Sequence, residues 1–208
     1  MTLDRVSKKY GQVHAVNDAT FTIPSNSWCV VTGPNGSGKT TMLELATALQ
    51  EPTEGRVRIG DVAAGEPAAR SAVSYLGDSP AFFSDLSAAE HLEYLAGLFH
   101  DPSVIDDGID VLEQFGLAQR VNDIPETFSR GMKQKTAIAL AVARPSSMLL
   151  LDEPTRGLDS AGSETLLRLL RQRHEAGATI VTVTHEPERF AHPGMIELRV
   201  SEGAFHLT

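Results

Sequence analysis

Residues 33–40 read GPNGSGKT, which is a complete G-x-x-x-x-G-K-[ST] phosphate-binding loop. Its three glycines allow successive backbone N–H groups to turn inward around phosphate oxygens, where a Cβ atom would crowd the ligand. We expect Lys39 to bridge the β- and γ-phosphates and the Thr40 hydroxyl to ligate Mg²⁺. The loop therefore predicts that the chain binds a nucleoside triphosphate with Mg²⁺. Its expected nucleotide contacts are Gly33, Pro34, Asn35, Gly36, Ser37, Gly38, Lys39, Thr40 and Thr41.

A pair of carboxylates, Asp152 and Glu153, directly follows the apolar run Met148–Leu151. Such a run predicts a buried strand beside the strand that enters the phosphate loop, with Asp152 at its tip close to the metal. Glu153 is then placed to orient an attacking water and to accept its proton. An Asp-Glu pair could also lie at a helix N-terminus, where the helix dipole favours negative charge. The phosphate loop earlier in the chain favours the interpretation as metal ligand and base.

The elements that must position these groups read as strands and helices around a helical middle. The phosphate loop lies between a strand over Trp28–Thr32 and a helix over Lys39–Leu49, which is the context that the motif requires. Buried parallel strands flanked by helices predict an α/β fold with a P-loop core, a mixed, mainly parallel sheet and an N-terminal antiparallel β region. We expect one domain of 208 residues, with the core over 1–78 and 144–208 and an inserted helical subdomain over 79–143.

Turn and capping residues predict where the other elements begin and end. Ser87-Ala-Ala-Glu90 is a capping box that starts a helix, and this helix runs through Phe99. Gly116 ends a second helix, and a third helix begins after Ser129. The remaining expected elements are the helices Val104–Phe115 and Ser160–Glu175 and the strands Ala19–Ile23, Arg56–Ile59, Val73–Leu76, Thr179–Thr184, Ile196–Val200 and Ala204–Leu207.

Composition limits the class of protein. A chain of 208 residues with 41% hydrophobic content can bury one core with an inserted lobe. The net charge of −9 argues against a nucleic-acid partner, which would need a basic face. The single cysteine, Cys29, lies in the apolar run WCVV and is expected to be a small buried side chain. No apolar run approaches the roughly 18–20 residues of a membrane span, so we expect a soluble, cytoplasmic chain that reaches the membrane through a partner.

The order GPNGSGKTT, FSRGM, LLLDEP, TRGLD and TVTHEPE resembles the ATP-binding cassette (ABC) family over nearly the whole chain. The phosphate loop occurs in many families, whereas a serine-glycine signature just ahead of a carboxylate strand is highly specific. The resemblance implies that two cassettes face each other and hold each ATP between one phosphate loop and the partner's signature. Ser129 and Gly131 would then contact the γ-phosphate bound to the opposite chain. Ser129 also fits an ordinary helix N-cap, and the two roles are compatible.

Three further residues take a role from the resemblance, and each has an alternative. Tyr10 matches the aromatic residue that stacks on adenine, although it could be an ordinary surface tyrosine. Asp159 matches the aspartate of a loop that crosses the dimer interface, and it could equally cap the following helix. His185 matches a switch histidine that contacts the γ-phosphate and would join Lys39 and Glu153 in catalysis. A lone histidine is usually structural, but its place at the end of a core strand favours a ligand contact.

Two positions depart from the family pattern. The signature at residues 128–132 reads FSRGM in place of leucine-serine-glycine-glycine-glutamine, a form that is similar to many ABC exporters and favours export. The family also places a glutamine beside Mg²⁺ or the attacking water, and the alignment puts Asp78 there. A carboxylate can ligate Mg²⁺, but near the γ-phosphate it adds like-charge repulsion. We therefore expect Asp78 to ligate the metal and to change the rate of hydrolysis or its coupling to transport. Alternatively, the side chain points away from the metal or is partly protonated.

Phe82 and Phe83 follow this position in the sequence PAFF. Adjacent aromatic residues in a loop are costly to expose without purpose. By resemblance, this region receives a cytoplasmic coupling helix of a transmembrane permease. Packing of both rings into the helical lobe is an equal alternative.

The predicted function is that of an ATP-binding and ATP-hydrolysing subunit that works as a homo- or heterodimer on a permease at the inner face of the cell membrane. The alternative is a non-transport ABC ATPase of DNA repair, chromosome structure or translation. Such a protein would show long heptad insertions, two cassettes in one chain or basic patches, and none is visible in this sequence. A small-metabolite kinase would have no use for the Ser129–Gly131 signature or for His185. The short segment after His185 predicts that no regulatory domain is appended. This compactness is similar to the haem-export subunit of cytochrome c maturation, which is a narrower candidate.

Overall fold

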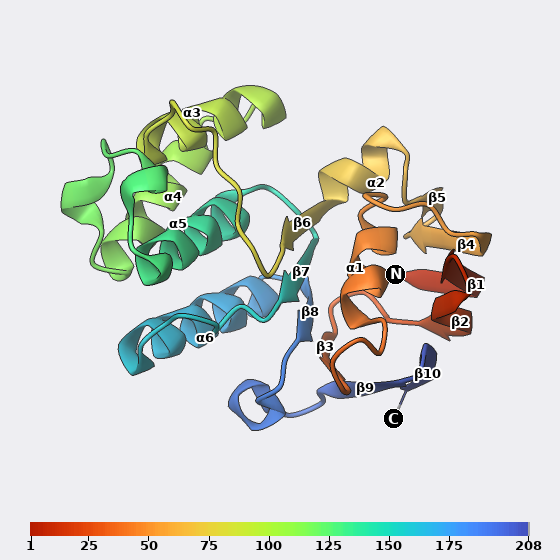
Figure 1. The fold of residues 1–208 in the computed structure, drawn as a ribbon. Helices are drawn as coiled ribbons and strands as arrows, with labels where there is room; N and C mark the ends of the chain where they lie inside the picture. The colour runs from red at the N-terminus through yellow and green to blue at the C-terminus, as the bar shows by residue number, and fades with distance from the viewer. Residues whose placement is uncertain (208) are drawn as a thin grey trace.

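Two β-sheets and a lobe of helices make up the chain in the computed structural model (Figure 1). The structure describes residues 1–207, so Thr208, the last residue of the expected domain, lies outside it. The N-terminal sheet packs against helix α1, and the helical lobe lies on the far side of the larger sheet (Figure 1). The α/β class predicted from the sequence is therefore confirmed.

The smaller sheet is antiparallel throughout, with the strand order β2-β1-β4-β5. It includes a first strand that the sequence did not indicate, and its second strand begins six residues before the expected one at Ala19. The reason is that register shifts after Leu3 and Val6 break the alternation of buried and exposed side chains in the first strand. The strands are β1 (Thr2–Tyr10), β2 (Val13–Thr22), β4 (Glu54–Ile59) and β5 (Val62–Ala63).

The larger sheet carries the strands that end at the predicted site. Its order is β10-β9-β3-β8-β7-β6, in which all neighbours are parallel except β9 and β10. Strands β7 and β8 are buried along their whole length, which explains why they read as continuous apolar runs. The strands are β3 (Trp28–Thr32), β6 (Val73–Leu76), β7 (Met148–Asp152), β8 (Thr179–Val183), β9 (Ile196–Ser201) and β10 (Ala204–Leu207).

Three helices flank the strands of the core, and the first of them follows the phosphate loop. This helix ends at Ala46, three residues before the predicted end, because Ala48 adopts a left-handed backbone conformation with φ 55°. The helices are α1 (Lys39–Ala46), α2 (Pro67–Ala72) and α6 (Ser160–Glu175), and a short 3-10 turn, Pro187–Phe190, follows β8.

The helical lobe lies in sequence between β6 and β7, which are neighbours in the larger sheet. The predicted capping box starts its first helix: the Ser87 hydroxyl accepts from the Glu90 N–H, and the Glu90 carboxylate accepts from the Ser87 N–H. A Cβ atom on Gly108 would lie 2.1 Å from Leu92 Cδ2, so glycine allows the first two helices to pack closely. The helices are α3 (Ala88–Phe99), α4 (Ser103–Gln114) and α5 (Arg130–Ala143), with 3-10 turns at Ala118–Arg120 and Pro125–Thr127.

The lobe and the core share one apolar cluster, which joins Leu92 of α3 and Ile138 of α5 to Leu149 of β7 and Leu166 of α6. A second cluster lies between the two sheets around α1 and contains Cys29, which is fully buried as expected. Burial raises the pKa of the Cys29 thiol to about 12, so this residue behaves as an apolar side chain. Across residues 1–207, no helix is long and apolar enough to cross a membrane.

Candidate nucleotide-binding site

The phosphate loop and the two carboxylates meet at one cavity of about 190 Å³. The cavity lies where β3, β7 and β8 end, which is the edge of a parallel sheet at which ligands bind. Most of the residues predicted from the sequence as nucleotide contacts therefore come together, although they are up to 150 positions apart. The lining residues are Ala15, Asn35, Gly36, Ser37, Gly38, Lys39, Thr40, Thr41, Asp152, Glu153, Val183 and His185.

The phosphate loop is held by contacts that only glycine allows. Gly33 and Gly38 have φ values of 150° and 105°. A Cβ atom on Gly33 would lie 2.1 Å from Val200 O of β9, and one on Gly38 would lie 2.0 Å from Ala15 O of β2. Both sheets thus fix the path of the loop, and its backbone conformation is set before any ligand binds.

The loop also contains a buried polar atom that suits an anion. The Ser37 hydroxyl is buried and finds no hydrogen-bond partner within residues 1–207. A buried donor without a partner is costly, so a ligand oxygen at this position would remove that cost. Helix α1 begins at Lys39, and its N-terminal N–H groups face the same space. These observations fit the phosphate groups of ATP.

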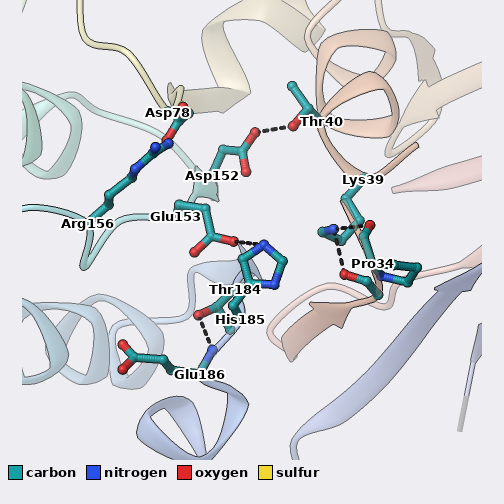
Figure 2. Close-up of polar contacts among 11 residues, drawn as sticks. Pro34, Lys39, Thr40, Asp78, Asp152, Glu153, Arg156, Thr184, His185 and Glu186 are labelled. Atoms are coloured by element: carbon teal, nitrogen blue, oxygen red, sulfur yellow. Dashed lines mark hydrogen bonds and ion pairs between the residues drawn. The ribbon is translucent and has the colours of Figure 1, made fainter. Parts of the chain in front are cut away.

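The ammonium group of Lys39 is fixed at the mouth of the loop. Its Nζ donates hydrogen bonds to Gly33 O at 2.7 Å and to Pro34 O at 2.9 Å (Figure 2). Burial lowers the pKa of Lys39, and the charges of Glu153 and Asp152 oppose that shift. The charged form therefore has the loop carbonyls and two carboxylates around it, which places a cation beside the expected phosphates.

Thr40 and Asp152 form the metal side of the cavity. The Thr40 hydroxyl donates to Asp152 Oδ2 at 2.5 Å (Figure 2). Asp152 ends β7 and is only 2% exposed, and its burial is the largest cause of the raised pKa of its carboxyl group. No group of three His, Cys, Asp or Glu side chains within 1–207 could hold a metal by itself. A hydroxyl and one carboxylate suit Mg²⁺, which takes hard oxygen ligands and completes its shell with phosphate oxygens and water.

Glu153 faces the same cavity from a strained backbone position. Its φ is 47°, a left-handed value for a residue with a side chain, and its N–H donates to Val183 O at 3.0 Å. Burial raises the pKa of Glu153, whereas the neighbouring His185 opposes the shift. A carboxylate whose pKa is raised accepts a proton more readily, which suits a general base.

His185 lies beside this carboxylate at the end of β8. Its Nε2 is 3.3 Å from Glu153 Oε1, which forms an ion pair when the imidazole is protonated (Figure 2). Glu153 Oε1 is a buried atom, so this contact with His185 holds that side of the carboxylate in place. The next residue, Glu186, donates its N–H to Thr184 Oγ1 at 3.0 Å, which fixes the turn that carries His185.

Ser129 and Gly131 lie at the N-terminus of α5 and do not line the phosphate-loop cavity. Ser129 is the N-cap of the helix, because its Oγ accepts from the Met132 N–H at 3.3 Å. A Cβ atom on Gly131 would lie 2.9 Å from Gly157 O, so this glycine allows the loop after β7 to pack against the helix. The structure thus places the signature away from the chain's own phosphate loop.

Asp159 and Tyr10 also lie outside the cavity lining. Asp159 caps α6 by accepting from the Gly162 N–H at 2.8 Å, and it pairs with Lys135 Nζ of α5 at 3.6 Å. Tyr10 ends β1 with 46% of its surface exposed, and Lys8 Nζ lies 5.1 Å from the centre of its ring. An exposed ring on β1, the strand next to β2 and its Ala15, is available for stacking.

Asp78 was predicted as a metal residue, and the structure places its carboxylate on the Arg156 guanidinium (Figure 2). Arg156 is therefore a residue of this region that the sequence did not single out. The sequence did offer a signal for Arg156: it lies three positions after Glu153, so its positive charge is close to a cluster of acidic residues.

The two adjacent phenylalanines separate in the structure. Phe82 packs against the apolar cluster that the lobe shares with the core. Phe83 is 51% exposed, stacks on His91 and meets the Tyr94 ring edge to face. The alternative of packing into the lobe thus describes Phe82, and Phe83 stays available to a partner.

Comparison with known proteins identifies the family. The model of the ABC transporter family matches residues 16–156. The cytochrome c biogenesis ATP-binding export protein CcmA of Paramagnetospirillum magneticum is 36% identical over 189 residues, covering 88% of this chain and 86% of that protein. The sulfate/thiosulfate import ATP-binding protein CysA 1 of Agrobacterium fabrum is 33% identical over 196 residues, covering 88% of this chain and 55% of that protein. The chain thus spans about half of this second relative.

Solved structures give the same result. The chain is similar to the dimeric ATP-binding cassette MJ0796 in a post-hydrolysis state bound to ADP and Pi, with a TM-score of 0.88 and 26% identity. This similarity covers 100% of this chain and 97% of that one. Together with the phosphate loop, the Thr40–Asp152 pair and Glu153, these comparisons show that the chain belongs to the ABC transporter family and is an ATP-hydrolysing cassette of that family.

Proposed function

We propose that this chain binds MgATP at the cavity between α1, β7 and β8 and hydrolyses it as one half of a dimer that drives a separate membrane permease. The Thr40–Asp152 hydrogen bond carries the proposal, because it joins the phosphate loop to the metal carboxylate across 112 positions of sequence. In this mechanism Thr40 and Asp152 would hold Mg²⁺, which would supply positive charge against the phosphates. Lys39 and the loop N–H groups bind the β- and γ-phosphates, and Tyr10 stacks on adenine.

Glu153 acts as the base in this mechanism. Its carboxylate accepts the hydrogen bond of the attacking water, and its raised pKa favours uptake of the proton. His185 contacts Glu153 on one side and the cavity on the other, so it orients the carboxylate and reaches toward the γ-phosphate. The imidazole thus links the position of the base to the presence of the last phosphate.

The proposed dimer is supported by signature and loop residues that do not line the chain's own cavity. Ser129, Gly131 and Asp159 lie at exposed helix N-termini away from the chain's own cavity. Free N–H groups at the start of α5 suit the γ-phosphate on a partner's phosphate loop. This arrangement supports a dimer in which each ATP lies between two chains, whether these are identical or not.

A groove of about 370 Å³ between β6, α3 and α5 suits the permease. It is lined mainly by apolar side chains, and Phe83 and Tyr94 at its rim are half exposed. We propose that Phe83 contacts a cytoplasmic segment of the permease, while Phe82 packs into the apolar cluster and holds the loop that carries Phe83. The chain would thereby be held at the cytoplasmic face of the membrane.

Export is the direction that we propose. The FSRGM form of the signature and the identity of 36% to an export protein of cytochrome c biogenesis support it. That relative also makes export in cytochrome c biogenesis a narrower candidate. Purification of the complex from membranes, followed by identification of the co-purifying permease, tests both proposals: an importer-type permease with a binding protein would contradict export.

The variant Glu153→Gln tests the catalytic proposal. It keeps the shape and the hydrogen-bonding oxygen of the side chain but removes the base, so it should bind MgATP and lose roughly 10²–10⁴-fold in hydrolysis. The trapped nucleotide should also shift the chain from monomer to dimer in gel filtration. Hydrolysis by the variant at the wild-type rate would contradict the role of Glu153.

A further inference from the structure

Asp78 and Arg156 form an ion pair at the edge of the nucleotide site (Figure 2). Asp78 follows β6 by two residues, and Arg156 lies in the loop after β7. These strands are parallel neighbours, with Leu76 beside Leu151 in the register, so both side chains arrive at the same edge of the sheet. There Arg156 Nη1 donates a hydrogen bond to Asp78 Oδ1.

Asp78 lies between a negative and a positive group of side chains. On the negative side is Asp152, whose pKa is raised mainly by burial and further by the charge of Asp78. On the positive side is a cavity of about 240 Å³, in which Arg130, Lys133 and Arg156 face Asp78, the one carboxylate among its lining residues. Coulombic forces from both sides therefore turn the Asp78 carboxylate away from Asp152.

Arg156 is the cation that pairs with the Asp78 carboxylate. The hydrogen bond that Arg156 donates to Asp78 and the negative charge of Asp78 raise the pKa of the guanidinium, and the charges of Glu153 and Asp152 contribute in the same direction. Lys133 is already paired with Glu126 at 2.8 Å. The planar guanidinium stays charged at every relevant pH and matches a carboxylate in geometry, which makes it suited to hold Asp78 permanently.

We propose that Arg156 is a positioning residue that holds Asp78 away from the metal and cancels its charge, so that Thr40 and Asp152 are the chain's own groups on the metal side of the site. This inference rests on the proposed MgATP site and assigns Asp78 a role other than the metal ligand that the sequence suggested. A free carboxylate at this position would repel the phosphates of ATP, whereas the ion pair is neutral as a whole.

The expected effect concerns nucleotide binding more than folding. Both side chains of the pair are partly exposed, and exposed pairs contribute little to stability. The variant Arg156→Gln leaves the Asp78 charge uncompensated and should weaken binding of a non-hydrolysable MgATP analogue roughly three- to tenfold at low ionic strength. Because the effect is electrostatic, the difference should shrink as salt is added.

Three further variants separate this role from a structural one. Arg156→Lys keeps the charge and should bind within about twofold of the wild type. Asp78→Asn leaves a cation near the phosphates and should bind equally or more tightly, with an unchanged Mg²⁺ requirement. The double variant Asp78→Asn, Arg156→Gln removes both charges and should restore wild-type affinity.

Isothermal titration calorimetry with the purified chain, the analogue and increasing Mg²⁺ measures these affinities, and thermal unfolding confirms that each variant is folded. A double variant as weak as Arg156→Gln alone would overturn the proposal, since Arg156 would then contact the nucleotide or support the fold itself. A tenfold higher Mg²⁺ requirement in Asp78→Asn would also overturn it, because Asp78 would then be a metal ligand. A wild-type chain that binds no MgATP would instead refute the proposed function.

Discussion

Asp152 is expected to lower the stability of the nucleotide-free chain at neutral pH, so that Asp152→Asn stabilises the fold while it abolishes metal binding. Asp152 is 2% exposed, and burial raises the pKa of its carboxyl group above the ordinary value of an aspartate. A folded-state pKa above the unfolded value means that the native state binds the proton more tightly. Stability is therefore greatest below the unfolded pKa and falls as the pH rises through the folded pKa.

The size of this effect follows from the shift. Each unit by which the pKa of Asp152 is raised costs about 1.4 kcal/mol of folding free energy at neutral pH. Asparagine removes that cost and still offers an oxygen to the Thr40 hydroxyl, which now donates to Asp152 Oδ2. For a chain of this size, a gain of about 1 kcal/mol raises Tm by about 2–4 °C.

Urea unfolding of wild type and Asp152→Asn between pH 4.5 and 8 measures the difference. We expect the variant to be more stable at pH 8 and its advantage to shrink toward pH 4.5, and MgATP should stabilise the wild type only. Glu93→Gln, on the exposed face of α3, is the matched control and should change stability by less than about 0.5 kcal/mol at any pH. A variant that is less stable than wild type at pH 8 would refute the reasoning.

Three other variants test the packing, the signature and the docking surface. Gly108→Ala places a Cβ atom 2.1 Å from Leu92 Cδ2 and should lower the free energy of unfolding by about 1–3 kcal/mol. The control Gly97→Ala, whose Cβ would have nothing within 4 Å, should be neutral or stabilising. Equal urea midpoints of the two variants would contradict the close packing of α3 and α4. Ser129→Ala removes the cap of α5 and should lower the free energy of unfolding by about 1 kcal/mol in the same assay. Its loss in ATP-driven dimerisation should be larger. Unchanged dimerisation in gel filtration would contradict a contact between Ser129 and the partner's nucleotide. Phe83→Glu should keep MgATP binding and lose co-purification with the permease, and retained co-purification would move the contact elsewhere.

The sequence could predict the parts of the site that depend on short motifs. The phosphate loop is one run of residues whose spacing defines its geometry, and Asp152 follows from the buried strand that precedes it. The pairing of Thr40 with Asp152 was implied by their common metal, although they lie far apart in the chain.

The ion pair of Asp78 with Arg156 could not be predicted in this way. It depends on β6 and β7 being neighbours in the sheet, which no local pattern specifies. Strand β1 was missed because its register shifts remove the alternation by which a half-buried strand is recognised. The different positions of Phe82 and Phe83 depend on the path of a loop and on His91, which lies on another element.

The most direct test of the two-chain site is complementation between two inactive variants. Lys39→Ala removes the phosphate loop's cation, and Ser129→Arg blocks the signature, so each variant alone should form dimers with two defective sites. A mixed dimer contains one site with both defects and one intact site. An equal mixture should therefore recover roughly a quarter of the wild-type ATPase rate, since half of randomly formed dimers are mixed. A mixture that stays as inactive as its components would contradict an ATP site built from two chains.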